Sequence, residues 1–259
     1  MKETSKERLI SALCAVASIG AFLLIWYLAC ALTALGKLLP DPVTVLVGMW
    51  GYITGTVGKC SLLMHAVHSL RRVLIGFVIG SAIGISLGLL MGRYRLARAI
   101  FNPIFRIIRP IPPIAWIPLT VFWFGIGLAG KVFIIWIAGI VPCVINSYVG
   151  VRMTNPTLIQ MARTYGANNW QIFTQLCIPS ALPMVFGALQ LALAYCWTNL
   201  VAAELLAADS GLGFLITMGG RLGRPDIIVL GMICVGLSGA VIGFIIDQIE
   251  KKLLAGIRR

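Results

Sequence analysis

Few side chains in this sequence have the type and spacing that catalysis or metal binding would need. The 259 residues include only eight acids and two histidines. His65 and His68 are three residues apart and could share one helix face, but no cysteine or carboxylate accompanies them at metal-ligand spacing. We therefore expect a surface pair of histidines, and no catalytic, metal or cofactor-binding residues in this chain.

One stretch nearly matches a phosphate-binding loop. Residues 125–132 read Gly-Ile-Gly-Leu-Ala-Gly-Lys-Val, which is close to the pattern Gly-x4-Gly-Lys-Ser/Thr. The final Ser or Thr, which would hold magnesium, is replaced by Val132, and no strand is predicted before the loop. We interpret the stretch as a tight turn. Any ATP and magnesium must then be bound by another polypeptide.

The composition is that of a membrane protein. The chain is 59% apolar and 11% charged, with a mean hydropathy of +0.97, whereas a soluble domain is about 25% charged. The net charge of +13 could suggest nucleic acid binding. However, the basic residues cluster at the ends of apolar runs, which is typical of flanks held near anionic headgroups.

Long apolar runs with almost no charge predict an all-α protein with six transmembrane helices, because a spanning helix needs about 20 apolar residues. The runs are 9–32, 73–91, 114–128, 132–149, 184–206 and 227–246. The first is too long for a signal peptide, so we expect it to be retained. Residues 1–68 then hold the first helix and an outer amphipathic segment, residues 69–250 a core of five helices, and residues 251–259 a basic tail.

The positive-inside rule orients these spans. With both termini in the cytoplasm, the inner segments carry 14 of the 21 Lys and Arg residues and the outer segments carry seven. This orientation places the loop between the fourth and fifth spans, near residues 150–183, in the cytoplasm.

Glu204 is the only acid within a predicted span. Ionisable residues in a span face the bundle interior or an aqueous cavity. A role in a pathway or gate and a structural hydrogen bond to a neighbouring helix both remain open. Trp197 and Asn199 lie one to two turns before Glu204, and we assign all three to a pathway.

A proline-rich stretch, Arg109-Pro-Ile-Pro-Pro-Ile-Ala-Trp-Ile-Pro118, leads into the third span. Each proline removes a backbone donor, and irregular backbone is tolerated at membrane depth only beside protein or a water-filled cavity. We therefore place Pro112, Pro113 and Trp116 within the bundle beside the pathway. A kinked turn at the membrane interface is the alternative.

The second span carries a stripe of glycines. They recur every fourth residue, at Gly76, Gly80, Gly84, Gly88 and Gly92. Small residues let helix backbones approach closely in lipid. We expect this face to pack against another helix, either of this chain or of a second copy.

The segment from Gln160 to Pro179 is the most informative part of the chain. Its pattern is an Ala at 162, a Gly four positions further at 166, and then Leu176, Ile178 and Pro179. This spacing resembles the cytoplasmic loop of ABC-importer permeases, in which an acidic-Ala-Ala triplet precedes the glycine. The triplet departs from the pattern at Gln160, which replaces the acid, and at Met161, which replaces the first Ala.

The chain as a whole resembles the permease subunits of the nitrate, sulfonate, taurine and bicarbonate group of ABC importers. The matching blocks are Ser69–Arg72 with Gly76, Gly88–Arg93, Arg109–Pro113, Ala115–Pro118, Trp123–Gly125, Gly150–Arg152, Ala162 and Arg163 with Gly166, Pro179 with Pro183, Ala202–Glu204, and Gly211–Gly213. The blocks run from about residue 69 to about residue 220.

The resemblance implies a type I importer architecture in a bacterial inner membrane. It implies two permease copies, two cytoplasmic ATP-binding subunits and an extracytoplasmic solute-binding protein. Residues 160–170 would form a coupling helix on the ATPase. The coupling residues would be Gln160, Met161, Ala162, Gly166, Trp170, Ile178 and Pro179. The substrate would be a small anion such as a sulfonate, taurine or nitrate, with a vitamin precursor as the alternative.

Two other classes of membrane protein compete with an importer permease. An ion-driven secondary transporter usually needs intramembrane carboxylates or histidines and often has inverted repeats. This chain has one peripheral Glu and no evident repeat. A membrane-embedded enzyme would need a nucleophile with its base, or a metal set, and the sequence shows neither.

Overall fold

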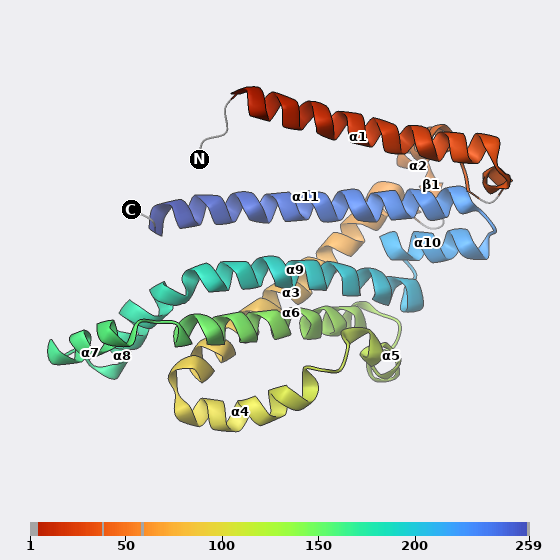
Figure 1. The fold of residues 1–259 in the computed structure, drawn as a ribbon. Coiled ribbons are helices and arrows are strands. Elements are labelled where there is room, and N and C mark those ends of the chain that lie inside the picture. Colours follow the sequence, from red (N-terminus) through yellow and green to blue (C-terminus); the bar gives the residue numbers. More distant parts are fainter. Residues whose placement is uncertain (1–4, 38, 58–59, 258–259) are drawn as a thin grey trace.

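The computed structural model describes residues 5–37, 39–57 and 60–257, and these are almost entirely helical (Figure 1). The elements are α1 (Ser5–Leu32), η1 (Ala34–Lys37), α2 (Pro42–Thr54), β1 (Thr56–Val57), β2 (Cys60–Ser61), α3 (Leu62–Arg93), α4 (Arg95–Ile108), η2 (Pro113–Trp116), α5 (Ile117–Phe124), α6 (Leu128–Arg152), α7 (Pro156–Thr164), α8 (Asn169–Gln171), the π-helix η3 (Ile172–Cys177), α9 (Ile178–Ala207), α10 (Leu212–Arg221) and α11 (Pro225–Ile257). Strands β1 and β2 pair antiparallel, with Thr56 opposite Ser61.

The described residues contain five helices long and apolar enough to span a membrane, or six if a bent pair counts as one span. The bent pair is Arg95–Ile108 with Pro113–Phe124, and its two halves meet at 82°. The long helices run alongside one another (Figure 1). The start of α1 and the end of α11 lie at the same end of the bundle as α7 and α8.

The third span therefore differs from the single apolar run expected at residues 114–128. Pro110, Pro112 and Pro113 interrupt the helix, and Pro112 takes an extended backbone with φ −59° and ψ 137°. The first half of the span is α4, whose arginines hid it from a search for charge-free runs.

The glycine stripe of α3 packs against α6 of the same chain. A Cβ added at Gly84 would lie 2.7 Å from Cys143 Cβ and 2.9 Å from the backbone oxygen of Ile140. The other four glycines of the stripe meet α6 in the same way. The close backbone approach therefore joins two helices of one copy.

Helix α9 packs on α6 beside α3, and the three helices form the centre of the bundle. Val73, Ile135 and Leu200 are completely buried in one apolar cluster there. Helices α10 and α11 share a second cluster built around Leu215 and Leu230. By contrast, the described side chains of α1 are mostly exposed, and Cys30 is the buried one among them.

Both expected boundaries of the core fall inside helices. Helix α3 begins at Leu62, directly after Ser61, whose Oγ accepts a hydrogen bond from the Met64 N–H at 3.3 Å. The boundary at residues 68 and 69 lies two turns into this helix. Helix α11 continues through residue 251 to Ile257.

Candidate functional sites

Glu204 sits in a buried network of hydrogen bonds at one end of the bundle. It lies on α9, and Arg72 of α3 donates to its Oε1 from Nη1 at 2.6 Å. The Ser69 hydroxyl lies 2.8 and 2.9 Å from the two carboxylate oxygens, and the Gly213 N–H donates to Oε2 at 3.0 Å. Glu204 is 1% exposed and Arg72 6%. The carboxylate is thus neutralised and fully occupied by hydrogen bonds, as a charge buried this deeply requires.

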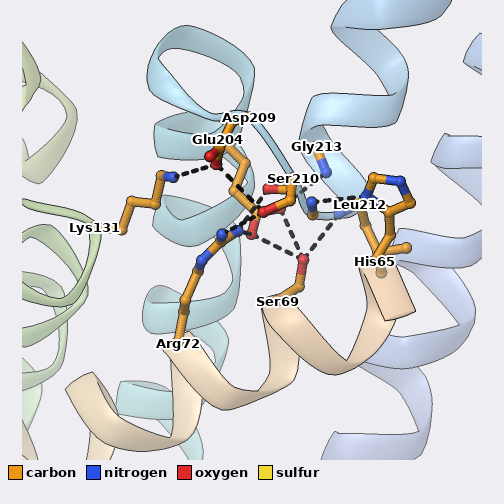
Figure 2. A network of polar contacts seen from close by, with 10 residues as sticks. His65, Ser69, Arg72, Lys131, Glu204, Asp209, Ser210, Leu212 and Gly213 are labelled. Atoms are coloured by element: carbon orange, nitrogen blue, oxygen red, sulfur yellow. Dashed lines mark hydrogen bonds and ion pairs between the residues drawn. The ribbon is translucent and has the colours of Figure 1, made fainter. Parts of the chain in front are cut away.

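The same face of α3 also holds the loop between α9 and α10 (Figure 2). His65 Nδ1 accepts from the Gly211 N–H at 3.0 Å, and Ser69 Oγ accepts from the Leu212 N–H at 2.9 Å. Arg72 donates to the backbone oxygen of Ser210 at 2.6 Å. Three side chains of one helix therefore bind successive residues of this loop.

Gly211 allows the loop to take this path. Its φ is +120°, in the region that favours glycine, and a Cβ there would collide with the Glu204 carboxylate. A third helix joins through Lys131 of α6, whose Nζ lies 3.7 Å from Asp209 Oδ1. The network, comprising His65, Ser69, Arg72, Lys131, Glu204 and residues 209–213, ties α3, α6, α9 and the loop together. We call it the ionic network.

The ionic network corrects one expectation. The sequence predicts a surface pair of His65 and His68, but the His65 side chain is completely buried and is stacked on Phe214 with ring centroids 6.0 Å apart. His68 is half-buried. The expectation is wrong for His65 because α3 starts at Leu62, so that this residue belongs to the packed bundle and not to an outer amphipathic segment.

A second feature is a cavity of about 340 Å³ near the middle of the bundle. Pro112 and Pro113, two of the residues assigned to the pathway from the sequence, line it. The polar side chains in its lining are Arg109, Asn146 of α6 and Tyr195 of α9. Since Tyr195 is 55% exposed, the cavity opens to one face of this copy. We call it the median cavity.

The other expected pathway residues lie outside the lining of the median cavity. Trp116 packs edge-on to Phe133 of α6, with ring centroids 6.5 Å apart. Trp197 faces α11, where a Cβ at Gly239 would lie 2.8 Å from its Nε1. Asn199 lies one turn beyond Tyr195 and donates to its backbone oxygen at 2.8 Å. Glu204 belongs to the ionic network instead.

The third feature is the loop from Gln160 to Pro179, at the opposite end of the bundle from the ionic network (Figure 1). Helix α7 ends at Thr164, and Gly166 has φ +82°. Three large side chains project from the loop, Met161 at 51%, Tyr165 at 86% and Trp170 at 64% exposure. Exposed apolar side chains grouped in this way are typical of a protein contact surface.

The remaining loop residues divide into exposed and anchoring ones. Gln160 and Pro179 are exposed. Ala162 and Ile178 pack against a buried cluster built around Val151, Phe173 and Cys177. Asn168 caps α8, with its side chain and that of Gln171 bonding reciprocally to the backbone at 2.8 Å. The loop is therefore a well-packed unit with an exposed outer surface.

The sequence profile of the family described as the inner membrane component of binding-protein-dependent transport systems matches residues 80–259. The chain belongs to this family. It is an ABC-transporter permease.

Similar permeases cover most of this chain. A protein of Methanocaldococcus jannaschii named as an ABC transporter permease is 37% identical over 76% of this chain and 74% of its own length. The taurine transport system permease TauC of Escherichia coli is 31% identical over 92% of this chain and 87% of its own length. The nitrate import permease NrtB of Leptolyngbya laminosa is 30% identical over 80% and 78%, respectively. These matches confirm the resemblance to the nitrate, sulfonate and taurine group.

The fold is also found among solved structures. An inward-facing form of the methionine ABC transporter MetNI aligns with a TM-score of 0.64 and 20% identity, over 76% of this chain and 96% of that chain. This match confirms the expected type I importer fold of the permease.

Sequence reasoning missed several residues of these sites. His65, Ser69 and Arg72 follow one another at intervals of four and three residues, which places them on one face of a helix. That spacing, together with a single acid within a span, was a signal from which the contact between this helix face and Glu204 could have been predicted. For Asn146 and Tyr195 the sequence carries no comparable signal, because nothing in it specifies that they meet at one cavity.

Proposed function

We propose that this permease forms the substrate pathway of an importer and works by alternating access driven by separate ATP-binding subunits. Its partners are a second copy of this chain, two cytoplasmic ATPase subunits and an extracytoplasmic solute-binding protein. The chain itself binds no nucleotide. Its substrate is a small anion such as a sulfonate, taurine or nitrate, the compounds named for its relatives TauC, SsuC and NrtB.

The observation that carries the proposal is that α6 and α9 connect all three features described above. Helix α6 runs into the Gln160–Pro179 loop and α9 follows it. The same two helices carry Asn146 and Tyr195 at the median cavity. They also carry Lys131 and Glu204 in the ionic network. Movement of the loop by an ATPase would therefore be transmitted along both helices to the cavity and to the far end.

The exposed outer surface of the loop supports its role as the ATPase contact. Met161 and Trp170 provide an apolar surface, and Gly166 supplies the turn between the two short helices. Gln160 takes the place of the usual acid, and we propose that it makes an uncharged polar contact with the ATPase. The coupling residues are thus Gln160, Met161, Ala162, Gly166, Trp170, Ile178 and Pro179.

The ionic network supports the proposal that the transport pathway is closed at its outer end. It lies at the end of the bundle opposite the loop, and it joins α3, α6, α9 and the α9–α10 loop through charged contacts. With the loop in the cytoplasm, this end faces the outside of a bacterial inner membrane. Both termini are then cytoplasmic, as the distribution of Lys and Arg favours.

The experiment that tests this function is uptake into proteoliposomes. The permease is reconstituted with its partner ATPase and binding protein, and uptake of taurine, an alkanesulfonate and nitrate is measured with and without ATP. We expect uptake that requires ATP and the binding protein. Uptake driven by an ion gradient without ATP would overturn the proposal, and uptake of a vitamin precursor alone would overturn the substrate assignment.

A further inference from the structure

Helix α4 carries a row of arginines that neither the ionic network nor the coupling loop uses. Arg95, Arg98, Asn102, Arg106 and Arg109 follow one another at intervals of three or four residues. Arg109, just after the helix, keeps helical backbone angles of φ −53° and ψ −41°. Residues at these intervals share one helix face, so the four arginines and Asn102 form a continuous row, which we call the arginine stripe.

The opposite face of α4 is apolar and exposed. Leu96 is 73% exposed, Ile100 51%, Ile104 53% and Ile107 74%, and no residue of the helix is buried. In a membrane, a face of this kind suits lipid or a second copy of the chain. On the other side, Arg98 and Asn102 of the arginine stripe are half-buried, whereas Arg95, Arg106 and Arg109 are exposed.

Two contacts show where the stripe points. The guanidinium of Arg98 lies 5.9 Å from the ring centroid of Tyr148 on α6, and its Nε donates to the Met91 oxygen at 3.3 Å. Arg109 lines the median cavity together with Pro142 and Asn146 of α6. The stripe therefore runs along α6.

The stripe extends to the middle of the span. Arg98 lies beside Tyr148, close to the end of α6 at Arg152, whereas Arg109 lies level with Ile137 and Val141, halfway along that helix. Fourteen residues of helix cover about 21 Å. Arginines that only reach for headgroups stay near the end of a span, so Arg109 is too deep for that role.

The stripe borders open space. A shallow hollow of about 360 Å³ on the surface of α4 is lined by residues of that helix alone, Arg95, Arg98, Ala99, Asn102 and Pro103. Further along the stripe is the median cavity, of about 340 Å³. Within the described part of the chain, the ion pairs involve Arg72, Lys131 and Arg224, and none involves an arginine of the stripe. The stripe is thus an uncompensated positive wall beside two hollows.

We propose that the arginine stripe is the wall of the cytoplasmic half of the transport pathway, and that it binds small oxyanions in transit. The inference rests on the proposed function, which gives the direction of transport. It deepens that function by naming residues that contact the substrate. A guanidinium offers paired N–H donors that match two oxygens of a sulfonate or nitrate. At the end of the stripe that lies in the middle of the span, Asn146 and Tyr195 add neutral polar groups beside Arg109. A row of fixed positive charges favours anions and repels cations along the whole route.

The first test measures water access and local potential without transport. Asn102→Cys on the stripe and Leu96→Cys on the apolar face are reacted with an anionic sulfonatoethyl and a cationic trimethylammonioethyl thiosulfonate. The reaction of the seven native cysteines in the unsubstituted protein is subtracted. After correction for intrinsic reactivity, we expect the thiol introduced by Asn102→Cys to react about tenfold faster with the anionic reagent. The thiol introduced by Leu96→Cys should react with neither reagent. Equal rates for the two reagents in the Asn102→Cys variant, or no reaction of its new thiol, would overturn the proposal even if uptake is normal.

A lipid phosphate could bind the same arginines. A second set of measurements therefore distinguishes a lipid headgroup from a soluble oxyanion. The reaction of the Asn102→Cys variant is repeated in nanodiscs of phosphatidylcholine alone, of phosphatidylcholine with phosphatidylglycerol, and of phosphatidylcholine with added methanesulfonate. Slowing of the anionic reagent by methanesulfonate supports a transit site. Slowing by phosphatidylglycerol alone would identify a headgroup site and overturn the proposal.

The transport arm uses Arg109→Gln, with Arg109→Lys to restore the charge. We expect Arg109→Gln to lower the initial rate of anion uptake severalfold, with the ATPase still bound, and Arg109→Lys to recover part of it. The matched control is Arg71→Gln, which removes one charge from an exposed arginine of α3. Equal uptake by the Arg71 and Arg109 variants would contradict a role for the stripe, whereas the absence of ATP-dependent uptake by the unsubstituted protein would point to failure of the importer assignment itself.

Discussion

Arg72 and Glu204 are 132 residues apart in the chain, yet the Nη1 of one lies 2.6 Å from the Oε1 of the other. Both side chains are buried, so each is the other's counter-charge in a place that water does not reach. The pair connects α3 to α9 at the end of the bundle where the α9–α10 loop is also held.

We predict that the two charges are strongly coupled. Glu204→Gln or Arg72→Met alone leaves a buried charge without its partner, which typically costs about 3–5 kcal/mol. The double substitution removes both charges and should cost less than the sum of the single substitutions. Thermal unfolding of the purified permease in detergent measures all four corners of the cycle.

The control for this cycle is Arg71→Met, an exposed neighbour on the same helix, which should unfold like the unsubstituted protein. If the two single substitutions add up in the double variant, the pair is not coupled and the ionic network is not a single unit.

The second prediction concerns the contact between α3 and α6. Gly84→Ala places a methyl group 2.7 Å from Cys143 Cβ and 2.9 Å from the Ile140 oxygen. Neither atom is the far end of a flexible side chain, so the helices must separate, at a cost of about 1–3 kcal/mol. The melting temperature and the yield of monodisperse permease on size exclusion should both fall.

Gly187→Ala is the matched control, because Gly187 also lies within a long helix, α9, and a Cβ there meets nothing within 4 Å. It should be neutral or stabilise by up to about 1 kcal/mol through higher helix propensity. Similar losses for both variants would show that the close approach at Gly84 is not what matters.

The third prediction concerns coupling. Gly166 has φ +82° with open space around its Cβ position, so Gly166→Val brings backbone strain of about 1–3 kcal/mol without a clash. The turn should change while the membrane helices still insert. We expect normal amounts in the membrane, with loss of ATPase binding in a pull-down and loss of uptake.

Gly166→Asn serves as the comparison, because asparagine adopts positive φ more readily than other residues with a side chain. It should keep most of the uptake that valine abolishes. Wild-type uptake by Gly166→Val with the ATPase fully bound would refute the coupling role.

The fourth prediction concerns orientation. A phosphatase reporter that is active only outside the cytoplasm is fused after Asn155, just before α7, and separately after Gly127, just before α6. The fusion at Asn155 should be inactive and the fusion at Gly127 active, because the Lys and Arg residues concentrate at the end of the bundle that carries the coupling loop. The reverse pattern would place the loop outside and remove the ATPase contact.

The sequence alone determined the membrane class, the positions of most spans and the family. These depend on local properties: a charge-free run such as 132–149, the four-residue spacing of Gly76 to Gly92, and the order of Ala162, Gly166 and Pro179 along one loop. Hydrophobic length and glycine spacing act within a single helix or turn, so they can be recognised without knowing which elements meet.

Only the tertiary structure decided which residues act together. A search for charge-free runs ignores which face of a helix a charge occupies, so the arginines of α4 concealed half of the third span. The burial of His65, the pairing of Arg72 with Glu204, and the separation of Trp197 from the median cavity depend on how each helix is rotated about its axis. That rotation is set by packing among α3, α6, α9 and α11, through contacts between residues far apart in the chain, and no single segment of the sequence specifies it.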